Sequence, residues 1–197
     1  MKFKAIHILI IPILLMACGE GYKKIDGNWA WVLHSEAGKH VRKINADIST
    51  FTILDSPEYA RDKNSVYWRG FEIENCDPET FKVITENGYA KDKKNVYLDT
   101  EIVIFANPST FEIIEWPYAK DDERIFNGNL PMNVDNIEEF EITKSSGMKT
   151  SSTKSFFIKQ NEGYTWLDTL SVNAIITGGS AEAKTQTQKF KGYKRIE

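Results

Sequence analysis

The stretch Tyr59-Ala60-Arg61-Asp62-Lys63-Asn64-Ser65-Val66-Tyr67-Trp68 decides the fold, because its pattern recurs along the chain. The same order of tyrosine, alanine, basic residue and aspartate returns at Tyr89 and at Tyr118. Each copy continues to an aliphatic-aromatic pair and is preceded by a Thr-Phe pair. The three pairs that precede the copies are Thr50-Phe51, Thr80-Phe81 and Thr110-Phe111. Self-similarity at a period of about 30 residues is typical of a repeat protein.

Each copy has the residue pattern of short strands joined by a tight turn. Runs such as Thr80-Phe81-Lys82-Val83-Ile84 are rich in β-branched and aromatic residues and alternate in polarity, which predicts strands. If Lys63-Asn64 are the central turn residues, a hairpin places Arg61 opposite Val66 and Ala60 opposite Tyr67. The same register pairs the small and aromatic residues of the other copies, namely Ala90 with Tyr97 and Ala119 with Phe126. A small residue opposite an aromatic one suits a packed sheet face.

The predicted fold class is therefore mainly β. We expect a tandem array of β-hairpin repeats, each about 30 residues long, forming a repetitive antiparallel β structure. A single repeat of this length cannot bury its aromatic face alone, so successive repeats are expected to stack. A decayed fourth copy is expected from Asp135, with Phe140 and Ile142 in the aromatic and aliphatic positions. A partial copy is expected to begin at Tyr22.

The repeated blocks resemble the DKNYY family of bacterial repeat proteins, named for a Tyr-x-Lys-Asp-Lys-Asn-x-x-Tyr-Tyr pattern. Residues 59–68 match this pattern best, and the resemblance covers residues 44–132 well. The third copy departs from it, with Asp122-Glu123-Arg124 where lysine and asparagine are expected, which puts its turn type in question. The family carries no established catalytic activity, so the resemblance implies an architecture and not a reaction.

The N-terminus has the order of a secretory signal. Residues 1–4 are basic, residues 5–16 are almost entirely apolar, and Cys18 follows Leu15-Met16-Ala17. The apolar run is shorter than the roughly 20 residues that span a bilayer. This ending resembles a bacterial lipobox, which implies that Cys18 is diacylated through its sulfur and acylated on its amine. The alternative is an ordinary signal peptide with an incidental cysteine.

The lipobox resemblance implies a lipid-anchored protein of the cell envelope. Gly19 stands where a signal for inner-membrane retention typically has aspartate, which favours the outer membrane. Four segments are predicted from these observations. They are a lipoprotein signal peptide (1–17), a lipidated N-terminus with a partial repeat (18–43), three DKNYY-like repeats (44–132), and a degenerate repeat with a β-rich C-terminal segment and a polar loop at 143–155 (133–197).

Composition and motifs exclude several classes of function. The chain has 25 Lys and Arg against 28 Asp and Glu, without a basic block, so nucleic acid is not an expected partner. No His-Glu-x-x-His, Walker A, Gly-x-Gly-x-x-Gly, Gly-x-Ser-x-Gly or Cys-x-x-Cys motif occurs. Two Ser-x-x-Lys matches, at 146–149 and 151–154, fall in a Ser/Lys-rich segment without the partner motifs of a penicillin-recognising enzyme, so we predict no catalytic residue, no cofactor and no metal site. His34 and His40 lack further zinc ligands, and the repeated aspartates are interpreted as turn residues and not as calcium ligands.

Two cysteines are present, and lipidation of Cys18 would leave Cys76 without a disulfide partner. Ala46 and Ala106 occupy the equivalent positions in the other copies. We therefore interpret Cys76 as a small, buried and inert side chain.

Aromatic residues provide the candidate binding surface. Trp68 follows Tyr67 in a predicted strand and lies across from Tyr59, so the Tyr59–Trp68 pair would form an apolar patch if its face is solvated. The alternative is burial of this pair against a neighbouring repeat. The leading functional hypothesis is a non-catalytic envelope lipoprotein that binds membrane lipid through Cys18 and an envelope protein through its array. The alternatives are a glycan- or peptidoglycan-binding protein and an envelope factor that gives immunity to a toxin.

Overall fold

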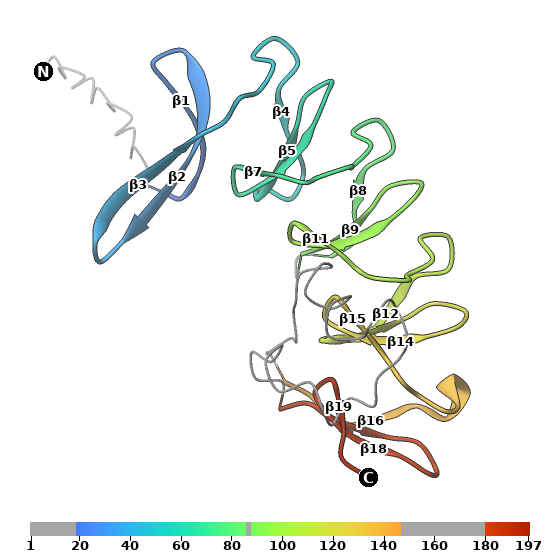
Figure 1. The fold of residues 1–197 in the computed structure, drawn as a ribbon. Helices are drawn as coiled ribbons and strands as arrows, with labels where there is room; N and C mark the ends of the chain where they lie inside the picture. The colour runs from blue at the N-terminus through green and yellow to red at the C-terminus, as the bar shows by residue number, and fades with distance from the viewer. Residues whose placement is uncertain (1–18, 86–87, 147–179) are drawn as a thin grey trace, which may run out of the picture.

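The computed structural model describes residues 19–85, 88–146 and 180–197, which form five small antiparallel sheets. The sheets follow one another in chain order along an arc (Figure 1). Over these residues the structure contains strands, turns and one 3-10 helix, η1 (Ile137–Glu139). No described segment forms an apolar helix of the length that a bilayer crossing needs. The predicted fold class, a repetitive antiparallel hairpin array, is confirmed.

One three-stranded sheet opens the array, and four-stranded sheets follow it. The first sheet contains β1 (Gly21–Ile25), β2 (Asn28–Ser35) and β3 (Gly38–Lys43). The second contains β4 (Thr52–Ile53), β5 (Tyr59–Arg61), β6 (Val66–Trp68) and β7 (Phe71–Glu72). The third contains β8 (Lys82–Val83), β9 (Tyr89–Lys91), β10 (Val96–Leu98) and β11 (Glu101–Ile102). The fourth contains β12 (Glu112–Glu115), β13 (Tyr118–Lys120), β14 (Ile125–Asn127) and β15 (Leu130–Met132).

The fifth sheet joins two distant parts of the chain. It contains β16 (Glu141–Lys144), β17 (Glu182–Lys184), β18 (Lys189–Lys191) and β19 (Lys194–Arg195). Ala183 lies opposite Phe190, which is the same small-aromatic pairing that the preceding sheets have. The predicted polar loop at 143–155 lies mostly outside the described residues, as does the signal segment with Cys18.

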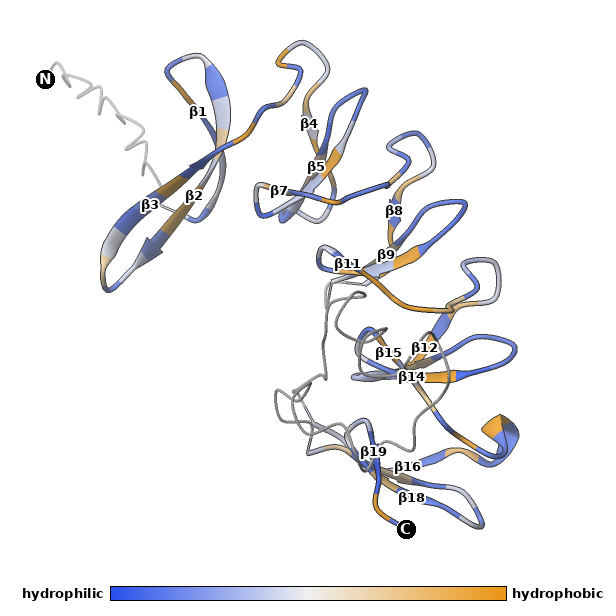
Figure 2. Cartoon of the chain, in the orientation of Figure 1, coloured by the Kyte–Doolittle hydropathy of each residue, from blue (hydrophilic) through white to orange (hydrophobic). Residues whose placement is uncertain are grey.

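The central hairpins have the register that the sequence predicts. Ala60 pairs with Tyr67 and Arg61 with Val66 in the second sheet. The equivalent pairs Ala90–Tyr97 and Ala119–Phe126 are also present, so the prediction is confirmed in each copy. Figure 2 shows hydrophilic residues at the hairpin turns and hydrophobic residues within the strands.

A phenylalanine from each four-stranded unit packs between its own hairpin and that of the preceding unit. The ring centroid of Phe81, for example, lies 5.5 Å from that of Tyr59 and 6.4 Å from that of Tyr97. The equivalent contacts are Phe51 with Tyr22 and Tyr67, Phe111 with Tyr89 and Phe126, and Phe140 with Tyr118 and Phe190. Because the cores lie between units, each unit depends on its neighbour for burial.

A second contact between units is a hydroxyl that donates to the next unit's backbone. The Tyr59 hydroxyl donates to the Gly88 carbonyl at 2.6 Å, and the Tyr89 hydroxyl donates to the Gly128 carbonyl at 2.7 Å. Tyr22 and Tyr118 make the same kind of bond at the two ends of the array. These tyrosines are buried and their hydroxyl groups are hydrogen-bonded, as a buried polar group requires.

The last unit ends the array with polar residues. Glu182 occupies the position of the buried tyrosines, and Lys189 occupies the position of the buried Val66, Val96 and Ile125. Lys184, Lys189 and Lys191 are exposed. A terminal repeat of a stacked array needs a polar outer face for solubility, and these residues provide one.

Candidate functional site

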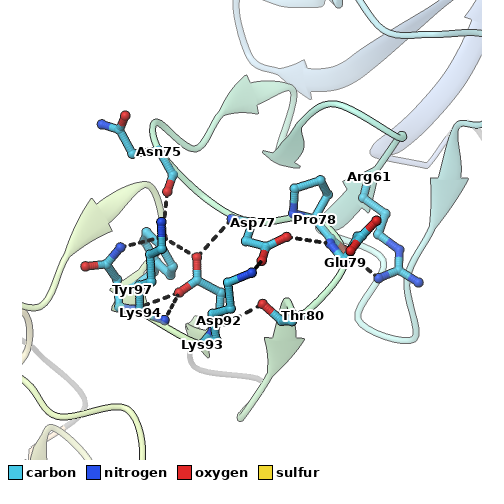
Figure 3. Close-up of polar contacts among 11 residues, drawn as sticks. Arg61, Asn75, Asp77, Pro78, Glu79, Thr80, Asp92, Lys93, Lys94 and Tyr97 are labelled. Atoms are coloured by element: carbon cyan, nitrogen blue, oxygen red, sulfur yellow. Dashed lines mark hydrogen bonds and ion pairs between the residues drawn. The ribbon is translucent and has the colours of Figure 1, made fainter.

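The strongest concentration of polar contacts in the array is centred on a buried aspartate in the hairpin turn of each central unit. Asp92 is 4% exposed and accepts four hydrogen bonds (Figure 3). Its Oδ1 accepts the backbone N–H groups of Lys94 and Asn95, both at 2.7 Å. Its Oδ2 accepts the Asp77 N–H and the Tyr97 hydroxyl, both at 2.9 Å. We call this arrangement the aspartate hub.

The hub ties three parts of one unit together. The Asp77 N–H belongs to the loop before β8, the two turn donors belong to the β9–β10 turn, and Tyr97 lies in β10. Burial alone would raise the pKa of Asp92, but the donated hydrogen bonds outweigh burial and the pKa is lowered. The side chain is therefore ionised at neutral pH, with its acceptor capacity used inside the fold.

The hub recurs with local variations. Asp62 accepts the same four bonds, from the N–H groups of residues 47, 64 and 65 and from the Tyr67 hydroxyl. Asp121 accepts the three backbone bonds, while Phe126 replaces the hydroxyl donor. The third copy keeps the turn geometry despite its different residues, since Asp121 N–H donates to the Arg124 carbonyl at 3.0 Å.

In the fifth sheet, two neutral side chains together accept the backbone hydrogen bonds that one aspartate accepts in the other hubs. Thr185 Oγ1 accepts the N–H groups of Thr187 and Gln188 at 3.3 and 3.1 Å. Gln188 Oε1 accepts the Asp135 N–H at 2.9 Å, which is the bond that Asp92 makes to Asp77. The fourth copy therefore retains the geometry without a buried carboxylate.

Cations next to the hubs serve structural contacts. Lys93 pairs with Asp77 at 2.6 Å, and Lys63 pairs with Asp47 at the same distance. Arg61 donates to the Pro78 carbonyl of the next unit at 2.7 Å, and Lys91 does the same to Pro108. Within the described residues, no group of three or more His, Cys, Asp and Glu side chains could hold a metal ion.

The proposed aromatic surface at Tyr59 and Trp68 is not exposed, and this part of the sequence interpretation is wrong. The two residues are cross-strand partners as expected. However, Tyr59 is 0% exposed and packs against Phe81 of the next unit, while Trp68 is half-buried with the Arg69 guanidinium 5.0 Å from its ring. Stacking of the repeats covers this face, so Tyr59 cannot contact a partner.

The other candidate side chains do not form a reactive group. Cys76 is half-buried, and burial raises the pKa of its thiol to about 12, which disfavours the nucleophilic thiolate. His34 lies opposite Lys39, and His40 lies opposite Leu33, so the two histidines are not cross-strand partners. His40 Nε2 lies 3.0 Å from Ser35 Oγ instead.

The sequence interpretation missed a groove between the second and third sheets. β4 and β8 each form an edge of their sheet, and residues near them line adjoining hollows. The apolar lining includes Pro57, Val83 and Ile84, and Ile53 beside them is 40% exposed. The sequence carries one signal for this groove, which is the aliphatic pair that follows each Thr-Phe pair, such as Ile53-Leu54 and Val83-Ile84. Adjacent residues of a strand point to opposite faces, so an aliphatic pair places an apolar side chain on both faces. We call this feature the rim groove.

Comparison with known proteins supports the assignment of the repeats. A sequence model of the DKNYY family matches residues 32–165, a longer span than the three clearest copies. No curated protein and no solved structure matches the chain. The matched span covers more than half of the chain and contains the aspartate hubs, so the protein belongs to the DKNYY family.

Proposed function

We propose that this protein is a non-catalytic lipoprotein of the cell envelope, anchored through Cys18, whose hairpin array binds another envelope protein. The lipobox-like sequence before Cys18 supports the anchor, and Gly19 favours an outer-membrane destination. The array supports a binding role because stacked repeats build extended surfaces.

The polar groups of the array favour binding over catalysis. The hub carboxylates of Asp62 and Asp92 are committed to backbone and tyrosine donors, and the thiol of Cys76 is held in its neutral form. A catalytic acid, base or nucleophile needs an accessible group with a free proton or lone pair.

The rim groove is the observation that carries the proposal. Its two edge strands, β4 and β8, are two residues long and leave backbone groups open on one side. An extended segment of a partner chain can pair with such an edge while its side chains enter apolar hollows. One hollow of the groove is lined by Glu58 and the adjoining hollow by Arg61 and Lys82, so the two ends of the groove differ in charge.

A glycan platform is less well supported by the exposed aromatic side chains. Phe71 is 47% exposed, but the Arg42 guanidinium lies 3.4 Å from its ring centroid. Phe105 is 36% exposed, with Arg124 at 5.6 Å. Sugars stack on free aromatic faces, and here one face of each ring already carries a cation.

Crosslinking of the tagged protein to solubilised envelope, followed by mass spectrometry, tests the binding role. Ile53→Lys is expected to abolish saturable capture of the partner, because it places a charge in the apolar rim groove. Ile196→Lys is the matched control, since Ile196 is 52% exposed and follows β19 in the fifth sheet, outside the rim groove. Equal capture by both variants, with unchanged unfolding curves, would reject the groove. Capture of oligosaccharide without protein, confirmed by a saturable tryptophan fluorescence titration, would favour the glycan function.

A further inference from the structure

The first sheet differs from the others because its second hairpin is much longer. β1 begins at Gly21, which lies opposite Val32 in β2. The β2–β3 hairpin continues past this point through three more cross-strand pairs, Leu33–His40, His34–Lys39 and Ser35–Gly38. Because β1 and β2 are antiparallel, this extension runs in the direction from which the chain enters β1. Figure 1 shows the hairpin projecting away from the rest of the array. We call residues 33–40 the overhang.

The position of the lipid-bearing residue places the overhang near the membrane. Cys18 precedes Gly21 by three residues, which can span at most about 11 Å when fully extended. The three overhanging pairs extend about 10 Å in the same direction, at the rise per residue of an antiparallel strand. With a lipid inserted at Cys18, the tip of the overhang is therefore within reach of the bilayer surface.

We propose that the overhang lies against the lipid headgroups beside the anchor and fixes the orientation of the array on an anionic membrane. This inference rests on the proposed lipidation of Cys18. Leu33 is 37% exposed on the face of the hairpin that also carries His40, and Val41, which is 41% exposed at the base of the overhang, lies on the other face. Such side chains are suited to the boundary between headgroups and acyl chains.

The charge of this unit matches an anionic surface. Residues 19–43 contain five Lys and Arg and three Asp and Glu, whereas the whole chain has a net charge of -3. Lys39 and Lys43 are exposed on β3, and Glu36 is the acidic residue of the β2–β3 turn. Basic side chains next to a lipid anchor are attracted to anionic headgroups, and their alkyl stems cover neighbouring apolar groups.

Site-specific labelling of the lipidated protein tests this orientation. Cys76→Ala, which copies Ala46 and Ala106, gives a background without another reactive thiol once Cys18 is acylated. Leu33→Cys and the control Ile114→Cys then receive a polarity-sensitive fluorophore. The two side chains have similar exposed fractions, 40% for Ile114 and 37% for Leu33, but Ile114 lies in β12 of the fourth sheet. The variants are reconstituted in vesicles of phosphatidylcholine and phosphatidylglycerol that contain a nitroxide lipid as quencher.

We expect loss of fluorescence at position 33 and none at position 114, with a smaller loss at position 33 in vesicles of phosphatidylcholine alone. Lys39→Glu should also reduce the loss at position 33. Equal quenching at the two positions in protein that floats with the vesicles would overturn the inference and leave the anchor intact. If mass spectrometry finds no lipid on Cys18 and the protein does not float, the proposed anchor fails, and the inference fails with it.

Discussion

Replacing Asp92 with asparagine tests whether the hub stabilises its unit as a charged acceptor. The asparagine oxygen can keep the two turn bonds from Lys94 and Asn95, but its amide then faces two donors, the Asp77 N–H and the Tyr97 hydroxyl. The Asp77 N–H then has no acceptor and the Tyr97 hydroxyl keeps only its 3.4 Å contact with the Asn75 carbonyl, so the substitution is expected to cost about 3 kcal/mol of unfolding free energy. Tyr97→Phe removes a single hydroxyl and is expected to cost about 1 kcal/mol. The third copy already has this arrangement, with Phe126 in the tyrosine position of the Asp121 hub.

Urea unfolding at neutral pH measures both losses, and hydrogen exchange of residues 77–97 shows whether the loss is local. Asp77→Asn, which removes a surface ion pair with Lys93, is the matched control and should leave stability nearly unchanged. The pKa of Asp92 is lowered in the folded state, so its contribution is present above the unfolded pKa of about 4 and is lost as pH falls through the folded pKa. The cost of Asp92→Asn should therefore shrink below pH 4. An Asp92→Asn variant that is no less stable than Tyr97→Phe would refute the reasoning.

Three further predictions concern other contacts of the array. Gly70→Ala should cost about 2 kcal/mol in urea unfolding, because Gly70 has φ +76° and an added Cβ would lie 2.7 Å from that of Trp31. Burial raises the pKa of Tyr67 to about 12, so stability should fall in urea titrations as pH rises from the unfolded value of about 10. Thr185→Asp copies the residue of the other hubs, yet it should lower the thermal midpoint, because Thr185 Oγ1 lies 2.9 Å from an Asp135 carboxylate oxygen.

The repeated hairpins could be predicted from the sequence because their determinants are local. A small residue opposite an aromatic one, with polar turn residues between them, specifies the pairing of Ala60 with Tyr67 without reference to the rest of the chain. The same reasoning recovered the equivalent pairs in the next two copies. Local sequence patterns indicate register well when the turn is two residues long.

The burial of Tyr59 and the rim groove could not be predicted in the same way. Both depend on how one unit stacks on the next. A strand pattern shows on which face of the sheet a side chain lies, but not what covers that face. Tyr59 is covered by Phe81, which lies 22 positions later in the chain. The Thr185–Gln188 replacement of the hub was also hidden, because its two residues share the role of one aspartate.

The four copies differ in the charges that surround the hub. In the first two copies, the loop aspartate beside the hub is paired with a lysine, as Asp77 is with Lys93. The third copy has neutral Asn107 at the loop position, and it donates at 3.1 Å to Asp122, which stands where the lysine was. The fourth keeps an acidic loop residue, Asp135, but has no lysine after Thr185, and its hub is neutral. The first, second and fourth copies thus avoid a hub carboxylate beside an acidic loop residue without a lysine, so Gln186→Lys should offset the cost of Thr185→Asp.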